Sequence, residues 1–192
     1  MGWTATFDVT LSDTPGGNPP ADGFSFNYGN IPQGDTGYRG FEEGWGSDTP
    51  YLSVEFDTWM VGDAEHGFNV GVDGTDVPGG FVNTDLITDG QTVNASVEIT
   101  YDPTDGVTLT VDDGGGPIDV FTDLATPGFV GDDNYTFNFG ARTGGATETL
   151  LIDNLNITTA AAAVPEPASI ALWSLLGLVG VGFGFLRYRR KK

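Results

Sequence analysis

Apolar and polar residues alternate along most of the chain before residue 160, which is the pattern of half-buried β-strands. The stretch 93–101 alternates over nine positions, and 107–111 follows it after the turn-forming residues 102–106, so we predict a hairpin. Further strands are expected at 3–11, 24–28, 51–59, 67–72, 135–142 and 149–158. No segment before the C-terminal tail repeats with a helical period. We therefore predict an all-β domain, built as an antiparallel sandwich.

The stretch 51–59, YLSVEFDTW, carries the most informative polar residues of the chain. Its apolar side chains point to one face, while Glu55 and Asp57 point to the other, beside Trp59. Neighbouring carboxylates repel each other unless a cation, a shared proton or hydrogen-bond donors compensate. Three interpretations follow: a site for a hard cation, acid/base chemistry on a sugar, or a plain solvated sheet face.

Composition limits the chemistry that the chain can perform. Its 192 residues, with 30 glycines, 11 prolines and 12% aromatic residues, fit one β-domain of sandwich size with an appendage. The absence of cysteine excludes disulfides, thiolate metal sites and a cysteine nucleophile.

Charge is divided unevenly along the chain. The net charge is −20, but five of the seven basic residues lie within 187–192. Residues 1–164, with two basic and 26 acidic residues, carry −24. So acidic a surface repels phosphate backbones, which argues against nucleic acid as a partner. It suits an exported protein whose aspartate-rich loops hold calcium.

The C-terminal tail has three parts in order. A small-residue linker, 160–164, precedes Pro165, Glu166 and Pro167; an uncharged stretch, 168–186, then leads to a basic cluster. About 19 uncharged residues can cross the ~30 Å hydrocarbon core as a helix. The basic cluster should stay in the cytoplasm. We therefore predict a transmembrane helix at 168–186.

This arrangement resembles the PEP-CTERM sorting signal of Gram-negative bacteria, here residues 165–192. The resemblance implies recognition by an exosortase and removal of the helix. It also implies delivery from the inner membrane to the cell surface or the extracellular polysaccharide matrix.

Export requires a signal peptide, but residues 1–12 lack a basic region followed by an apolar run. They read as a strand instead. We expect that the given sequence starts late, and that a signal peptide and a first strand or two precede it.

A second resemblance covers residues 2–159. The motifs ADGFSFNYG, SVEFDTW, NVGVDG, the 93–111 hairpin and FGARTGG…IDNLNI occur in this order. Together they resemble the concanavalin A-like fold, and more closely the legume (L-type) lectins and their bacterial relatives. The resemblance implies an antiparallel β-sandwich (jelly roll) over residues 1–159 that binds carbohydrate.

The lectin resemblance also implies metal ligands. Glu55 matches a ligand of a transition metal, and Asp57 matches the aspartate that bridges this metal to calcium. The backbone carbonyl of Trp59 matches a calcium ligand, and Asp63 is the candidate for the second bridging aspartate.

Two positions depart from the lectin pattern. Val61 stands where lectins have an asparagine that binds calcium and sugar, and Asn69 stands where they have a histidine ligand. The single histidine, His66, we interpret as a surface-loop residue. Without imidazole we expect the transition-metal site to be lost, since oxygen-only ligand sets favour calcium. Calcium is then expected at Asp57 and Asp63.

The carbohydrate-binding residues implied by the resemblance lie in loops. Asp22, which in lectins follows a cis peptide and accepts sugar hydroxyls, is the first; the alternative is a turn aspartate before glycine. Gly37 or Gly40 would offer a backbone N–H to the sugar. Trp59 could stack on a sugar ring, as could Tyr38 and Trp45, although large aromatics in sandwiches commonly pack in the core. The loop 143–145 matches the one that tunes lectin specificity, or is a glycine-rich turn.

A glucanase on the same fold is the enzymatic alternative. Such enzymes place a third carboxylate two or three residues after the E-x-D pair. Trp59 and Met60 occupy those positions, so a general acid is missing and we expect no catalysis. Two functions remain: a carbohydrate-binding surface protein, or a structural or adhesion matrix protein whose sites have degenerated. The valine at position 61 favours the second.

Overall fold

The computed structural model describes residues 1–13, 20–31, 40–41, 44–45, 50–59, 66–142 and 146–159, with backbone alone at 40, 41, 44 and 45. These residues are organised as β-strands. They are β1 (Trp3–Ser12), β2 (Gly23–Gly29), β3 (Gly40–Phe41), β4 (Gly44–Trp45), β5 (Tyr51–Asp57), β6 (Gly67–Val72), β7 (Thr75–Asn83), β8 (Thr92–Asp102), β9 (Gly106–Asp112), β10 (Ile118–Leu124), β11 (Thr136–Arg142) and β12 (Thr149–Thr159).

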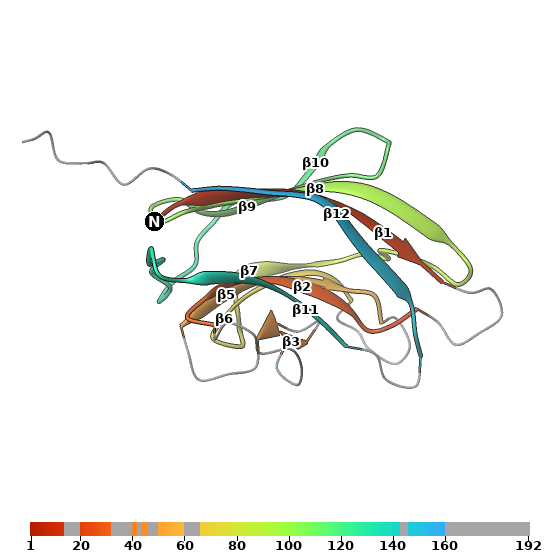
Figure 1. Ribbon diagram of the computed structural model, residues 1–192, viewed down its shortest axis with the longest axis horizontal. Coiled ribbons are helices and arrows are strands. Elements are labelled where there is room, and N and C mark those ends of the chain that lie inside the picture. The colour runs from red at the N-terminus through yellow and green to blue at the C-terminus, as the bar shows by residue number, and fades with distance from the viewer. Residues whose placement is uncertain are drawn as a thin grey trace, which may run out of the picture. The chain divides into compact units, whose positions relative to one another are not determined.

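Two antiparallel sheets face each other, as Figure 1 shows. Sheet I has the strand order β10-β9-β8-β1-β12, and sheet II has the order β11-β2-β5-β6-β7. The short β3–β4 pair lies against the outer side of sheet II, where β3 contacts β11 and β4 contacts β2 and β5. The predicted all-β sandwich is confirmed.

The predicted hairpin of β8 and β9 is present. Two residues of its turn, Asp102 and Gly106, explain why the chain reverses direction here. The Asp102 carboxylate accepts hydrogen bonds from the backbone N–H groups of Thr104 (2.7 Å) and Asp105 (3.3 Å), and this holds the pKa of Asp102 below its usual value. Gly106 has φ +100°, and a side chain there would meet the Leu124 carbonyl oxygen. Glycine is therefore needed where the return strand begins.

Aromatic rings fill much of the space between the sheets. Trp3, 3% exposed, contacts the rings of Phe26, Tyr28 and Tyr101 as well as Phe137. The Tyr28 hydroxyl donates to the Asp132 carbonyl oxygen (2.7 Å), and burial raises the pKa of Tyr28 to about 12. The buried Tyr28 hydroxyl thus keeps a partner, whereas Trp3 Nε1 is buried without one.

Strands β7 and β10 were not predicted, because both break the alternation on which the prediction rests. β7 contains Pro78 between polar and glycine residues, which its position at the edge of sheet II tolerates. β10 is the edge of sheet I, and its pairing with β9 shifts register on both sides of Phe121. Bulges of this kind move side chains off the two-residue period.

Residues 1–160 form one compact unit. The expected transmembrane helix at 168–186 lies outside the described residues, as does the 160–164 linker. In the part of the chain that the structure describes, no helix is long and apolar enough to cross a membrane.

Candidate functional site

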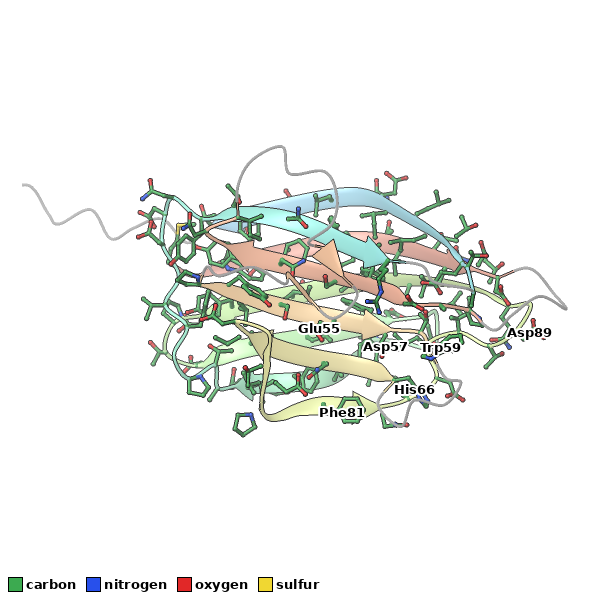
Figure 2. The ribbon with its side chains drawn as sticks, turned by 90° about the horizontal axis from the view of Figure 1, so that it is seen from below. Glu55, Asp57, Trp59, His66, Phe81 and Asp89 are labelled. Atoms are coloured by element: carbon green, nitrogen blue, oxygen red, sulfur yellow. The ribbon has the colours of Figure 1, made fainter. Side chains whose placement is uncertain are left out.

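Strand β5 lies at the centre of sheet II, between β2 and β6. Its apolar residues Val54 and Phe56 are 1% and 3% exposed and pack in the core. Glu55 and Asp57 lie on the outer face of the sheet, as Figure 2 shows. The two-faced character predicted from the alternation is therefore correct.

The outer face around Glu55 is not solvated. Glu55 is 6% exposed, and Ser25, Asn27 and Ser53 beside it are fully buried. Strands β3 and β4 contact this sheet at β2, β5 and β11. The interpretation of Glu55 as part of a plain solvated face is therefore wrong, because the alternation shows which way a side chain points but not what lies above it.

Hydrogen bonds from neighbouring strands hold the Glu55 carboxylate. The Ser53 hydroxyl donates to Oε1 (2.6 Å), and the Asn69 amide donates to Oε2 (3.3 Å). Asn69 is the cross-strand partner of Glu55 in β6. The nearby Tyr51 hydroxyl has its pKa raised to about 12, first by burial and then by the charges of Glu55 and Asp73.

The geometry of Asn69 does not fit a transition metal at Glu55. Its amide nitrogen bonds Glu55 and also the Asp76 carboxylate (2.7 Å), while its oxygen accepts from the Val70 N–H (2.8 Å). Carboxylates cannot donate, so the group between Glu55 and Asp76 must be the NH₂. An amide donor therefore faces both the Glu55 and the Asp76 carboxylates.

His66 is not a freely exposed loop residue. Its side chain is 16% exposed, and Nε2 lies 3.0 Å from the Asp85 carboxylate. His66 therefore lies in the loop before β6, half-buried beside an exposed aspartate. Because Asp85 comes 19 residues later, the sequence offered no local sign of the pair.

The end of β5 meets the segment that precedes β2. Asp57 Oδ1 accepts the Trp59 N–H (2.8 Å), and the Thr58 N–H donates to the Asp22 carbonyl oxygen (3.1 Å). Asp57 and Gly23 are cross-strand partners. Asp22, from one motif, and Asp57 and Trp59, from another, are therefore brought to one end of sheet II.

The Ala21–Asp22 peptide bond is cis, as the lectin resemblance implied. Gly23 then adopts φ +114°, and a side chain there would meet the Phe56 carbonyl oxygen. Glycine is therefore required after Asp22 by the close approach of β5.

An ion pair that the sequence did not predict involves Asp22. Arg142 Nε donates to Asp22 Oδ2 (3.2 Å), and the side chains are 44% and 16% exposed respectively. The Asp22 N–H also donates to the Arg142 carbonyl oxygen (3.2 Å). Asp22 is thus fixed to the end of β11, 120 residues away, and is more than a turn residue.

Glu148 is a further acidic group at this end of the sandwich, which no motif indicated. Both of its carboxylate oxygens are buried without a hydrogen-bond partner. Burial raises the pKa of Glu148, and the charges of Asp13, Asp22 and Asp57 raise it further. The nearby Thr58 hydroxyl acts in the opposite direction and lowers the pKa of Glu148, although the two side chains form no hydrogen bond of good geometry.

Replacing Glu148 with glutamine is expected to stabilise the protein at about pH 7 and to change little near pH 4. The folded state holds the Glu148 proton to a higher pH than the unfolded chain, whose pKa is 4.5. Stability is thus highest below that value and falls as pH rises through the folded pKa. The gain at neutral pH should be about 1 kcal/mol or less, since the group is partly exposed.

Thermal unfolding at both pH values measures this gain in stability. The control is Glu98→Gln, on the exposed face of β8. Equal effects of Glu148→Gln at both pH values would contradict the assignment.

Several predicted site residues lie outside the described part of the chain. They are Gly37, Tyr38, Met60, Val61, Asp63 and the loop 143–145. Gly40 is described in its backbone alone, paired with Trp45 between β3 and β4. Across the described ranges, no three His, Asp or Glu side chains are arranged to hold a metal ion.

Solved structures with a similar fold include several lectins. Basic winged bean lectin with Tn-antigen matches with a TM-score of 0.61 at 23% identity, covering 81% of this chain and 70% of that one. Winged bean acidic lectin complexed with methyl-α-D-galactose gives 0.59 at 22%, covering 81% and 69%. The exoplasmic/lumenal domain of VIP36 in its Ca²⁺/Man-bound form gives 0.58 at 16%, covering 86% and 70%. The sandwich therefore has the concanavalin A-like fold of the legume lectins.

The tail has its own match. Residues 163–191 match the PEP-CTERM protein-sorting motif, which includes Pro165, Glu166 and Pro167. The chain is thus an exported protein that carries an exosortase sorting signal C-terminal to a domain with the lectin fold. No curated protein sequence matches the chain.

Proposed function

We propose that this protein binds extracellular polysaccharide at the cell surface, through the end of sheet II where Asp22, Asp57 and Trp59 meet. The observation that carries the proposal is the placement of Asp22. The Thr58 N–H donates to its carbonyl oxygen, and the next residue, Gly23, pairs with Asp57 at the end of β5. This is where the lectin resemblance requires a sugar-binding carboxylate.

Each residue has a separate part in the proposed site. The Asp22 carboxylate would accept hydrogen bonds from sugar hydroxyls, which are strengthened by its charge. A backbone N–H of Gly37 or Gly40 would donate to the sugar, and the half-buried ring of Trp59 would stack on its apolar face. The site would bind and not catalyse, since the E-x-D pair lacks a third carboxylate in the E-x-D-x-E or E-x-D-x-x-E spacing.

The second candidate is a matrix or adhesion protein that uses the sandwich as a spacer. Two features favour it. Arg142 already occupies one oxygen of Asp22, and Val61 stands in place of the expected asparagine. In both candidates the precursor would be anchored in the inner membrane through its tail, then released by exosortase to the surface or matrix.

The test is a glycan-array screen of the tail-free protein, followed by Asp22→Asn. The variant keeps shape but loses charge, so affinity should fall by about 1.5–3 kcal/mol, the scale of a hydrogen bond to a charged group. Stability should change by less than about 1 kcal/mol, the worth of an exposed ion pair. Asp105→Asn, in the β8–β9 turn, is the control. If the parent protein binds no glycan while Asp22→Asn is destabilised, the spacer function replaces the lectin function.

Calcium is proposed to bind at Asp57 and Asp63, with the Trp59 carbonyl as a further ligand. The donors are all oxygen, which suits a hard cation. Asp22, Asp57 and Glu148 lie close enough for their charges to interact. A cation would relieve the repulsion between them.

Millimolar calcium is expected to raise the melting temperature, because it binds the native state alone. At about 100 times the dissociation constant the gain would be ~2.7 kcal/mol. Asp57→Ala should abolish it, as thermal unfolding with and without calcium can measure. An undiminished gain in the variant would place calcium elsewhere, for example at Asp112 and Asp113.

A further inference from the structure

The space between the sheets is filled at one end and open at the other. Along β8 the inward-facing residues Val97, Ile99 and Tyr101 are at most 2% exposed, whereas Val93 and Ala95 on the same face are half-buried. The partner strand β9 shows the same gradient. Its inward-facing residues, from the filled end to the open end, are Val107, Leu109 and the half-buried Val111. Apolar side chains therefore line the open end as well, but they are only half-buried there.

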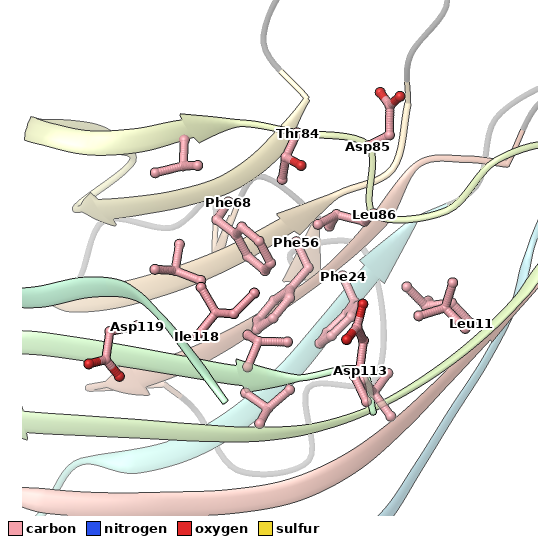
Figure 3. Close-up of a pocket in the computed structure, with 17 residues that line it drawn as sticks. Leu11, Phe24, Phe56, Phe68, Thr84, Asp85, Leu86, Asp113, Ile118 and Asp119 are labelled. Carbon is pink, nitrogen blue, oxygen red and sulfur yellow. The ribbon is translucent and has the colours of Figure 1, made fainter. Parts of the chain in front are cut away.

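A cavity of about 360 Å³ occupies this open end. Figure 3 shows that both sheets contribute to it, with Leu11 on one side and Phe24, Phe56 and Phe68 on the other. Its volume lies within the ~300–1,000 Å³ of small-molecule pockets. Most of the wall is apolar and so offers ordered water few of the two to four partners that it needs.

The polar groups of the cavity carry negative charge. Asp85, Asp113 and Asp119 are exposed among its lining residues, and so is Ile118 (64%). Asp113 accepts the Gly115 N–H (3.0 Å), which does not neutralise its carboxylate. Asp119 pairs with Thr110 of β9 and accepts its hydroxyl (2.8 Å), so its carboxylate lies on the outer face of sheet I. Asp85 contacts His66. None of the lining residues is lysine or arginine.

We propose that this cavity binds a small amphiphile that has an alkyl chain and a cationic head group. The chain would cover the half-buried valines and alanine between the sheets. The head group would lie beside Asp85 and Asp113, where an anionic head group would be repelled. This site is separate from the proposed carbohydrate site, and its test does not depend on glycan binding.

The probes are decyltrimethylammonium and decyl sulfate, which share a chain length and differ in the sign of the head-group charge. Residues 1–160, which form a compact unit with its own core, are used so that the apolar tail cannot take up either probe. Titration calorimetry below micelle formation should show one ammonium ion bound per chain. Its affinity should exceed that of the sulfate by about tenfold or more, because like charges at the mouth are costly.

Two substitutions of Ala95 place larger side chains inside the cavity. Ala95→Leu should weaken ammonium binding, and Ala95→Phe should weaken it by more than about tenfold, as expected when added volume fills a packing gap. The control is Asn94→Phe, which puts the same ring on the exposed outer face of β8. Asp85→Asn combined with Asp113→Asn should remove the preference for the ammonium probe.

Ala95→Leu keeps the test decisive if the phenylalanine variant does not fold. Binding that is unchanged in a folded Ala95→Leu protein would overturn the proposal, as would equal affinity for both probes. Dimerisation that Ile118→Ser abolishes, together with absence of probe binding, would also overturn it, because a second copy of the chain would then cover the opening.

Discussion

Protein recovered from an exosortase-bearing host is expected to lack Ile170–Lys192, the last 23 residues of the chain. The match of residues 163–191 to the PEP-CTERM motif supports this expectation. The two prolines around Glu166 favour an extended backbone directly before the apolar stretch, which leaves this segment accessible to a processing enzyme. Replacing Pro165, Glu166 and Pro167 together by alanine should leave the tail in place. Intact-mass spectrometry distinguishes the two forms.

Ala161→Ser is the control for that experiment, because it alters the neighbouring linker and leaves the three motif residues intact. It should be processed like the parent protein. Recovery of the parent protein with Lys192 still attached would contradict the prediction. Normal processing of the triple alanine variant would contradict it as well, since the signal would then lie elsewhere in the tail.

Replacing Glu55 with alanine is expected to lower the free energy of unfolding by about 2–4 kcal/mol. The change removes the acceptor for the Ser53 hydroxyl (2.6 Å) and the Asn69 amide (3.3 Å). A hydrogen bond to a charged group contributes ~1.5–3 kcal/mol. The Ser53 hydroxyl would keep only its longer contact with the Gly71 carbonyl oxygen (3.4 Å), while the Asn69 amide would keep Asp76 (2.7 Å). Denaturant unfolding monitored by tryptophan fluorescence measures the loss.

The matched control is Glu98→Ala, at an exposed position of β8, which should change stability by less than ~0.5 kcal/mol. Calcium should not restore the Glu55→Ala protein, because the lost contacts are hydrogen bonds and not metal ligation. A loss for Glu55→Ala no greater than that of the control would mean that the Glu55 hydrogen bonds do not stabilise the fold.

The sequence by itself determined the strands whose two-residue period is unbroken. β1, β5, β8 and β9 could be predicted because a strand turns successive side chains to opposite faces, so apolar residues on one face produce a readable pattern. The C-terminal signal was equally readable, since its three parts are contiguous. The edge strands β7 and β10 were not, because Pro78 and the register shifts around Phe121 break the period.

The tertiary structure alone decided the surroundings of the candidate site. Glu55 was expected on the outer face, but only the folded structure shows that it is buried there and bonded to Ser53 and Asn69. Asp22 was found by motif, yet its partner Arg142 lies 120 residues away. Glu148 carried no motif, and its raised pKa results from burial and from carboxylates that folding brings close. Periodicity determines which face a side chain occupies, whereas contacts between distant segments determine what it meets there.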